Sequence, residues 1–216
     1  MNKKAVSQVS IIGGADGPTS VFILGQNKSR LLFRQKLHKM LYDIRKRYIM
    51  RGIKANPHSL DEVTDYIKSK GYKELDEDTM EYKIEYRQMR ASFLLQYKPQ
   101  LLGGLAEFPK LEEHSTEAVN EFMEQMEQRR KAAEEVPREL FDIEMHILDK
   151  HDDNTSSRIV IEKKYGYIGG SASGEKNLKE YHKLFREVYK YYGVSQEDID
   201  QKTKRYEELV RTLAIK

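Results

Sequence analysis

Apolar side chains recur every three or four residues in the first third of the chain, at Phe33, Leu37, Met40, Leu41, Ile44, Tyr48 and Ile49. This spacing places a single apolar stripe along a helix. Asn27 or Ser29 is positioned to cap its start, and Gly52 and Pro57 favour its end. We expect the stripe to pack in the protein core.

The same period predicts five further helical segments, from Ser59 to Gly71, over Asp78–Tyr97, from Ser115 or Thr116 to Pro137, over Lys176–Tyr192, and from Ser195 to Ile215. Ser59 and Glu62 have the spacing of a capping box, in which each side chain bonds the other's backbone. Asp78–Tyr97 also alternates like a strand, but its length and its Gln, Arg, Met and Ala content favour a helix.

Strict alternation marks the clearest strand, where Phe141, Ile143, Met145 and Ile147 are separated by polar residues. A polar loop, Asp149–Ser157, would connect it to Ile159–Ile161 and then Tyr165–Ile168 as a β-hairpin. A short helix starting at Pro137 is the alternative. Near the N-terminus, Val6–Ile12 and Thr19–Leu24 are rich in β-forming residues and predict two short strands, or one strand and a tight reversal.

These elements predict an α+β fold that is mostly helical, with a small sheet built from the N-terminal strands and the hairpin near residues 141–168. We expect one domain over residues 1–216. Its parts would be a strand-turn-strand at 1–26, a helical region at 27–136, the hairpin and a glycine-rich loop at 137–174, and C-terminal helices at 175–216.

Composition narrows the class of protein. Hydrophobic residues make up 38% of the 216 residues and charged residues 34%, which suits a polar globular protein. The absence of cysteine excludes disulfides and thiolate metal sites. No stretch approaches the ~20 apolar residues that a membrane helix needs. We therefore expect a cytoplasmic protein without a membrane span.

Charge is segregated along the chain. Lys28–Lys54 holds ten Lys/Arg and one acid, a net charge of +9, whereas Asp61–Ile147 holds 12 Lys/Arg and 21 Asp/Glu, a net charge of −9. The two segments would attract each other within one chain or across a homodimer. Alternatively, the basic segment forms a surface for nucleic acid or an acidic protein. The residues expected on that surface are Arg34, Lys39, Arg45, Lys46, Arg47 and Arg51.

A glycine-rich segment, Gly13–Ser20, is the most distinctive motif. Its glycines leave backbone amides uncovered, and Asp16 among them would bind a cation or close a turn on its own backbone. We take this as a candidate ligand or cation loop formed by Gly13, Gly14, Asp16, Gly17 and Thr19.

The run from Gly13 to Ser20, GGADGPTS, resembles a signature of the β subunit of sodium-ion-translocating decarboxylases. In that family the motif lies in an interrupted membrane segment, and its Asp, here Asp16, is implicated in the sodium pathway. The resemblance reaches from about Val9 to Leu24 and covers under a tenth of the chain. The remaining sequence has none of that family's hydrophobic segments, so the resemblance implies a local loop geometry and not a sodium pump.

A second glycine-rich segment, Gly169–Gly174, precedes a predicted helix. A strand, a glycine-rich loop and a helix N-terminus together can bind phosphate. The candidate anion-binding residues are Gly169, Gly170, Ser171, Ser173 and Lys176. The segment matches neither a P-loop nor a dinucleotide fingerprint, and a flexible loop with a serine cap is the plain alternative.

Candidate metal ligands are His146, His151 and Asp152, since imidazole and carboxylate suit zinc, manganese or iron. No standard ligand spacing is matched, and a solvated hairpin loop is the alternative. No nucleophile motif or catalytic set is present, and no cofactor is indicated.

The sequence thus favours binding over catalysis: an accessory or regulatory protein that uses its charge-segregated helices to hold a protein or nucleic acid. The alternative is an enzyme or small-ligand sensor whose site joins the Asp16 loop to the Gly169–Gly174 loop.

Overall fold

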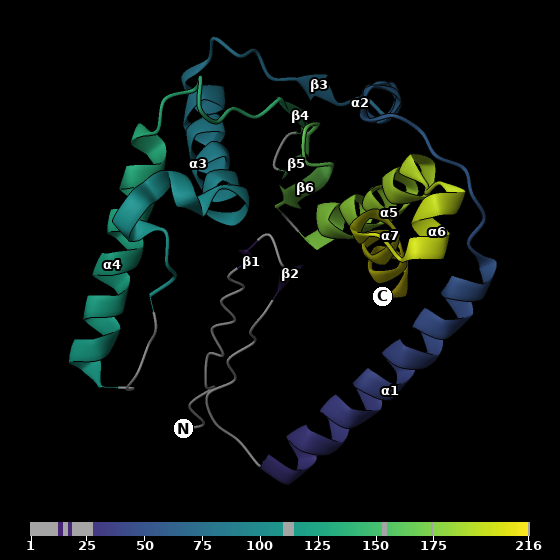
Figure 1. Cartoon of the computed structure of the whole chain (residues 1–216). Coiled ribbons are helices and arrows are strands. Elements are labelled where there is room, and N and C mark those ends of the chain that lie inside the picture. Colours follow the sequence, from purple (N-terminus) through teal and green to yellow (C-terminus); the bar gives the residue numbers. More distant parts are fainter. Residues whose placement is uncertain are drawn as a thin grey trace, which may run out of the picture. The chain divides into compact units, whose positions relative to one another are not determined.

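The computed structural model describes residues 13–14, 17–18, 28–109, 115–152, 155–173 and 175–215 (Figure 1). The chain, for which the sequence predicted a single domain, divides into two compact units, Met1–Arg45 and Lys46–Lys216. The predicted α+β class is confirmed, because long helices accompany a small antiparallel sheet.

In the first unit, two short strands, β1 (Gly13–Gly14) and β2 (Gly17–Pro18), pair antiparallel, with Gly13 opposite Pro18 and Gly14 opposite Gly17. They lie inside the predicted glycine loop. The predicted strands Val6–Ile12 and Thr19–Leu24 fall outside the described residues. Helix α1 (Lys28–Gly52) begins in this unit and ends in the second.

The second unit holds the remaining elements. Its helices are α2 (Leu60–Ser69), α3 (Met80–Tyr97), the 3-10 helix η1 (Pro99–Leu105), α4 (Thr116–Glu135), α5 (Glu175–Tyr192), α6 (Gln196–Gln201) and α7 (Lys204–Ala214). Its strands are β3 (Lys73–Glu74), β4 (Met145–Asp152), β5 (Thr155–Glu162) and β6 (Tyr167–Ala172). The helical interpretation of Asp78–Tyr97 is therefore confirmed by α3. Among the described helices, none combines the length and apolar composition needed to cross a lipid bilayer.

The four strands form one antiparallel sheet in the order β3-β4-β5-β6, so each strand lies beside its sequence neighbour. Its first described strand is β3, and β1 and β2 pair with each other in a separate two-stranded sheet. A place in the sheet for Val6–Ile12 and Thr19–Leu24 stays a prediction, because these residues lie outside the described part of the chain. The predicted loop Asp149–Ser157 is wrong, because β4 and β5 pair from Met145 opposite Glu162 to Asp152 opposite Thr155. Phe141 and Ile143 are buried, but the strand begins only at Met145.

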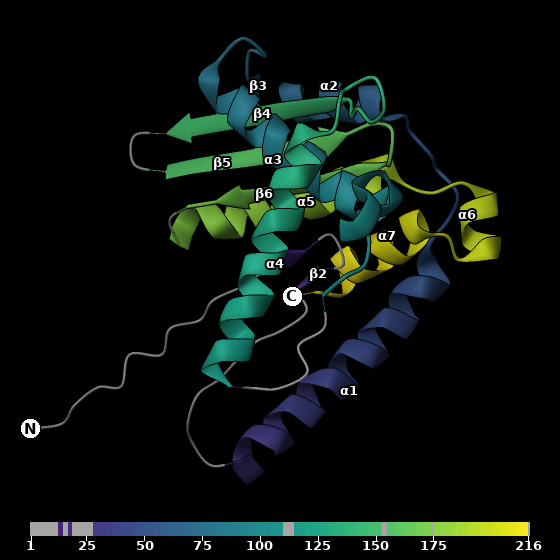
Figure 2. The same cartoon turned by 60° about the vertical axis from the view of Figure 1, so that its left-hand side comes forward.

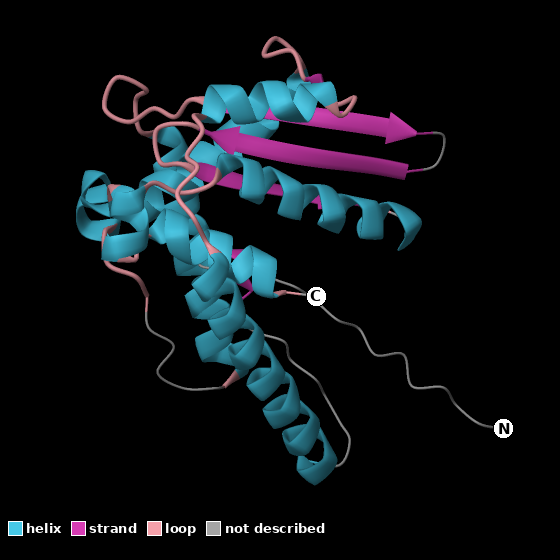
Figure 3. Cartoon of the chain, turned by 90° about the vertical axis from the view of Figure 1, so that its right-hand side faces the viewer, coloured by secondary structure: helices cyan, strands magenta, loops and turns pink. Residues whose placement is uncertain are grey.

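Helices cover both faces of this sheet, and each face has its own core. Leu148, Ile159, Ile161 and Ile168 pack with α2, α5 and α7 on one face (Figure 3). Ile147 and Val160 pack with α3, α4 and the segment that precedes β4 on the other face (Figure 2). Alternation along β4 and β5 sends successive side chains to opposite faces, which explains how one strand supplies both cores.

Local capping fixes several helix boundaries as the sequence predicted. Ser59 and Glu62 form the expected capping box of α2, and the Ser115 hydroxyl accepts a hydrogen bond from the Ala118 amide at the start of α4. The single C-terminal helix that we expected is wrong. Lys202 adopts a left-handed conformation with φ of 55°, and Thr203 caps a new helix, so α6 and α7 are separate.

Candidate functional site

The apolar stripe of α1 lies exposed instead of in the core, which corrects the sequence-based prediction. The side chains of Leu37, Met40, Leu41, Ile44 and Tyr48 are between 42% and 80% exposed. Their spacing of i, i+3, i+4, i+7 and i+11 keeps them on one face of the helix. Met50, in the last turn of α1, and Ile53, just beyond the helix, do pack against the core formed with α5.

Basic side chains border this stripe on both sides. At about 100° per residue, Arg45 follows one flank of the stripe, and Lys36 and Arg47 follow the other. Lys39 and Lys46 lie on the opposite face of the helix. Within the described part of the chain, no ion pair engages any of these five cations. The stripe and its basic flanks, Lys36–Tyr48, are called the α1 surface below.

A cleft of about 800 Å³ lies where β6, α5 and the end of α7 meet. The α5 side carries a row of cations, Lys179, Lys183, Arg186 and Lys190, together with His182 and Glu187. The facing wall is formed by Tyr167, Gly169 and Gly170 of β6 and by Thr212 and Ile215 at the end of α7. We call this hollow the α5 cleft.

Two aromatic rings of α5 give the cleft an apolar floor. The centroids of Tyr181 and Phe185 are 5.4 Å apart with their planes 25° from parallel. Tyr181 is buried, and Phe185 is half-buried. Burial raises the pKa of the Tyr181 hydroxyl above its usual range, as it does for Tyr167 on the facing wall. Both hydroxyls therefore stay neutral and can donate hydrogen bonds at neutral pH.

The glycine pair belongs to a strand, and the predicted loop Gly169–Gly174 is wrong up to Ala172. Gly169 pairs with Val160 and Gly170 with Ile159 in the β5–β6 ladder. A Cβ at Gly170 would lie 2.1 Å from the Arg158 carbonyl oxygen and 2.8 Å from the Tyr181 hydroxyl. A Cβ at Gly169 would meet the Tyr167 ring. Both glycines are thus required for close packing of tyrosines, which shapes the wall of the α5 cleft.

The other candidate anion ligands are placed differently. The Ser173 hydroxyl lies 3.0 Å from the Ser156 hydroxyl and accepts a hydrogen bond from the Ser156 amide at 3.1 Å, so it ties the ends of β5 and β6 together. Ser171 is exposed near the end of β6. Lys176 lies in the first turn of α5, and its side chain is outside what the structure describes. Gly169 and Gly170 alone among the five line the cleft as described.

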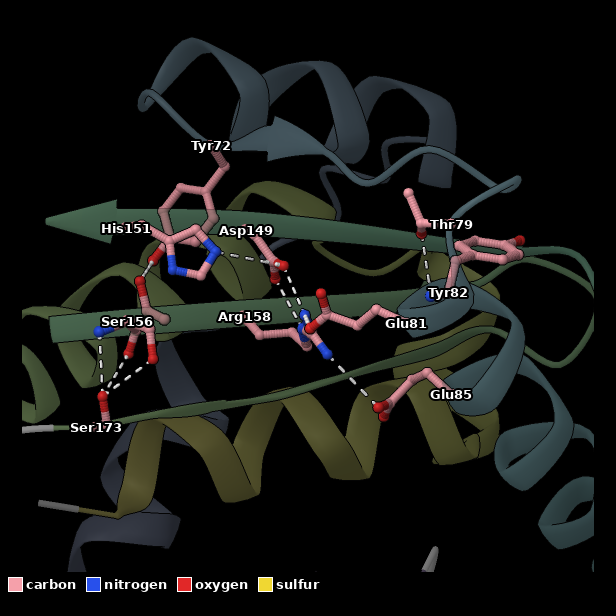
Figure 4. Close-up of polar contacts among 11 residues, drawn as sticks. Tyr72, Thr79, Glu81, Tyr82, Glu85, Asp149, His151, Ser156, Arg158 and Ser173 are labelled. Carbon is pink, nitrogen blue, oxygen red and sulfur yellow. Dashed lines mark hydrogen bonds and ion pairs between the residues drawn. The ribbon is translucent and has the colours of Figure 1, made fainter.

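A dense polar network on the α3 face of the sheet centres on Arg158 (Figure 4). Its Nε donates to Asp149 Oδ1 at 2.7 Å, and one terminal nitrogen donates to Asp149 Oδ2 at 2.6 Å. The guanidinium also bonds Glu81 and lies 3.6 Å from Glu85, both on α3. These contacts hold α3 to the sheet, and they raise the pKa of Arg158, chiefly through its bond with Asp149.

The predicted metal ligands are not brought together in the described structure. His146 and His151 are five residues apart on β4, so they point to opposite faces. His146 Nδ1 pairs with Glu74, which also accepts an ion pair from Lys68 at 2.6 Å. His151 is 70% exposed, 3.7 Å from Asp149. Asp152 ends β4 opposite Thr155. Among the described residues, no group of three or more His, Asp or Glu side chains is arranged to hold a metal ion.

The sequence-based interpretation missed the cation row of α5. Its signal was present, since Lys179, Lys183, Arg186 and Lys190 follow the spacing i, i+4, i+7 and i+11. The basic segment Lys28–Lys54, with ten Lys/Arg and one acid, has the stronger charge signal in the sequence. Of the N-terminal ligand loop, Gly13, Gly14 and Gly17 lie in β1 and β2, whereas Asp16 and Thr19 are outside the described residues. A shared site between that loop and Gly169–Gly174 stays a prediction.

Comparison of the chain with known protein families, with curated proteins and with solved structures finds no match.

Proposed function

We propose that this protein is a binding protein whose α1 surface docks into an apolar groove of an acidic partner protein. The exposure of Leu37, Met40, Leu41, Ile44 and Tyr48 on one helix face supports this most directly. Helices that bind in protein grooves use anchors at i, i+3, i+4 and i+7, and the stripe has this pattern. Covering such side chains removes apolar area from water, which favours association.

The charges on the flanks favour an acidic partner. Arg45 on one side and Lys36 and Arg47 on the other would meet carboxylates at the rim of the groove, where they speed association and fix orientation. A nucleic acid would use the cations but would leave five apolar side chains without a partner, because phosphates offer them nothing. The apolar stripe therefore favours a protein over a nucleic acid.

Site-specific photocrosslinking tests the proposal in cells that make the protein. A photoreactive residue at Ile44 should crosslink to a partner protein, whereas one at Lys46, on the opposite face of the helix, should not. The captured protein is then purified for a binary binding measurement by calorimetry.

Three variants separate the contributions of the apolar stripe, the flanking cations and the opposite face of α1 to the measured affinity. Ile44→Asp should weaken binding at least ~10-fold, and Arg45→Glu/Arg47→Glu should weaken it and reduce its salt dependence. Lys39→Glu/Lys46→Glu, on the opposite face, should change affinity about 2-fold or less. Capture of RNA or of lipid in place of protein, or equal crosslinking at residues 44 and 46, would contradict the proposal.

A further inference from the structure

The α5 cleft has a chemistry of its own, apart from the α1 surface. Four cations line it against one carboxylate, Glu187. Within the described part of the chain, no ion pair engages Lys179, Lys183 or Lys190. Arg186 donates to the carbonyl oxygen of Ile215, which also lines the cleft. Such an uncompensated row attracts an anion.

The row suits a ligand with several negative charges. From Lys179 to Lys190 the cations extend about 16 Å along the helix, one in each successive turn. A single carboxylate or sulfate would contact one or two of them. A nucleic-acid strand, with a phosphate on each nucleotide, can contact the whole row, and the phosphates of a nucleotide can contact neighbouring members of it.

The apolar part of the cleft suits a flat ring. The Tyr181–Phe185 pair and Tyr167 line this part of the cleft, and the Tyr167 and Tyr181 hydroxyls fill the space beside Gly169 and Gly170. Proteins that bind nucleotides or single strands combine cations for the phosphates with aromatic side chains on which bases stack. A cleft of about 800 Å³ is of the size that ligand-binding sites have.

We propose that the α5 cleft binds nucleotides, with the phosphates along Lys179, Lys183, Arg186 and Lys190 and a base against Phe185 and Tyr167. The shared chemistry is a phosphate with an aromatic base, and it has two sources, a free nucleotide or a single-stranded nucleic acid. The cleft and the α1 surface use different cations, so substitutions in one can be tested without changing the other.

Fluorescence anisotropy of the full-length protein tests this with two probes, a fluorescent ATP analogue and a labelled random-sequence 12-nucleotide single strand. Lys179→Glu/Lys183→Glu should weaken binding of the preferred probe at least ~10-fold. Arg87→Glu/Lys98→Glu is the matched control, because it reverses two exposed cations outside the cleft and makes the same change in net charge. It should change affinity less than ~3-fold, and circular dichroism should show that each variant is folded.

The base is tested separately. Phe185→Leu keeps an apolar side chain in the core but removes the stacking surface, and it should weaken binding ~5-fold or more. Inorganic tripolyphosphate has no base. Displacing the bound probe should therefore require at least a ~10-fold higher concentration of tripolyphosphate than of ATP.

The outcomes separate the sources and can overturn the proposal. Binding of ATP would identify a free nucleotide, and binding of the strand alone would identify single-stranded nucleic acid. If neither probe binds at a protein concentration of up to ~1 mM, the proposal is overturned. An equal loss in the control variant, an equal loss when Arg45 and Arg47 of α1 are reversed, or competition by tripolyphosphate equal to that by ATP would also overturn it.

Discussion

Asp149 and Arg158 lie directly opposite each other on β4 and β5 and are joined by two hydrogen bonds of 2.7 and 2.6 Å. The Asp149 side chain is 9% exposed and that of Arg158 is 19% exposed. A charge pair this sheltered is stabilising mainly because removing one member leaves the other buried without its partner.

Asp149→Ala should therefore lower the free energy of unfolding by about 2–4 kcal/mol. The loss is limited because Glu81 and Glu85 still compensate part of the Arg158 charge. Urea denaturation followed by circular dichroism measures this. Lys83→Ala breaks an ion pair whose side chains are 53% and 98% exposed, and it should cost about 0.5 kcal/mol or less. Equal effects of the two substitutions would show that the Asp149–Arg158 pair contributes no more to stability than an exposed ion pair.

A methyl group at Gly170 has no room. Gly170→Ala would place Cβ against the Arg158 carbonyl oxygen and the Tyr181 hydroxyl, so β6 or α5 must shift. We expect a loss of about 1–3 kcal/mol in unfolding free energy. Gly104→Ala, where nothing lies within 4 Å of the added Cβ, should stay within about 0.5 kcal/mol of the parent. Thermal unfolding of both variants gives the comparison, and a neutral Gly170→Ala would show that the β6 wall is not tightly packed.

Acid should weaken the joint between α6 and α7. Burial raises the pKa of Asp198, but hydrogen bonds from Thr203 and Ser195 outweigh it, and the pKa lies below its usual range. A carboxyl with a lowered pKa stabilises the fold above its unfolded pKa of about 3.8, and this contribution is lost as pH falls through the folded pKa.

Asp198→Ala should consequently cost about 1–2 kcal/mol at pH 7 and progressively less from pH 4 downward. Urea midpoints measured from pH 7 to pH 2.5 test this for both proteins. A difference between the two proteins that stays constant across that range would rule out a charge-dependent role of Asp198.

Alkali should weaken the core under α3. Burial raises the pKa of Tyr82 to about 12 and does the same for Tyr86. A raised pKa means that stability is fully present below the unfolded value of about 10 and is lost as pH rises through about 12. Tyr82→Phe removes the hydrogen bond to the Met145 carbonyl oxygen and should cost about 1 kcal/mol at pH 8. Its stability should then fall less steeply than the parent's between pH 10 and 11.5, as measured by urea midpoints.

Features that depend on residues close together in the sequence, such as helix caps, could be predicted from the sequence. The capping box at Ser59 was predicted because both partners lie within three residues, and Ser195 and Asp198 form a second box with the same spacing. The extent of the sheet was not predicted, because polar β4 and β5 residues such as Asp149 and Arg158 satisfy each other across strands. Their pairing depends on register, which a single strand does not reveal. The break at Lys202 was likewise missed, since a lysine in the left-handed region carries no distinctive signal.

The candidate sites divide in the same way. The basic α1 surface was predicted from spacing and charge, but the exposure of its apolar stripe was not, because periodicity shows that residues share a face without showing what covers it. The α5 cleft is lined by residues of β6, α5 and the end of α7. Residues such as Gly170 and Lys183 lie on different elements, so their place in one cleft could not be predicted from sequence spacing. The Ser173 hydroxyl, expected among the anion ligands, lies within hydrogen-bond distance of the Ser156 hydroxyl, a contact between two strand ends that the sequence does not show, and its part in anion binding stays a prediction.

Thiol reactivity tests the exposure of the α1 stripe most directly, because the chain contains no cysteine of its own. In the folded protein, Ile44→Cys should react with a thiol reagent within ~3-fold of the rate of Lys46→Cys, which is exposed on the opposite side of the helix. Ile67→Cys, at a fully buried position, should react at least ~100-fold more slowly. Protection of residue 44 comparable to that of residue 67 would show that the stripe is covered within the protein itself and would contradict its role as a docking surface.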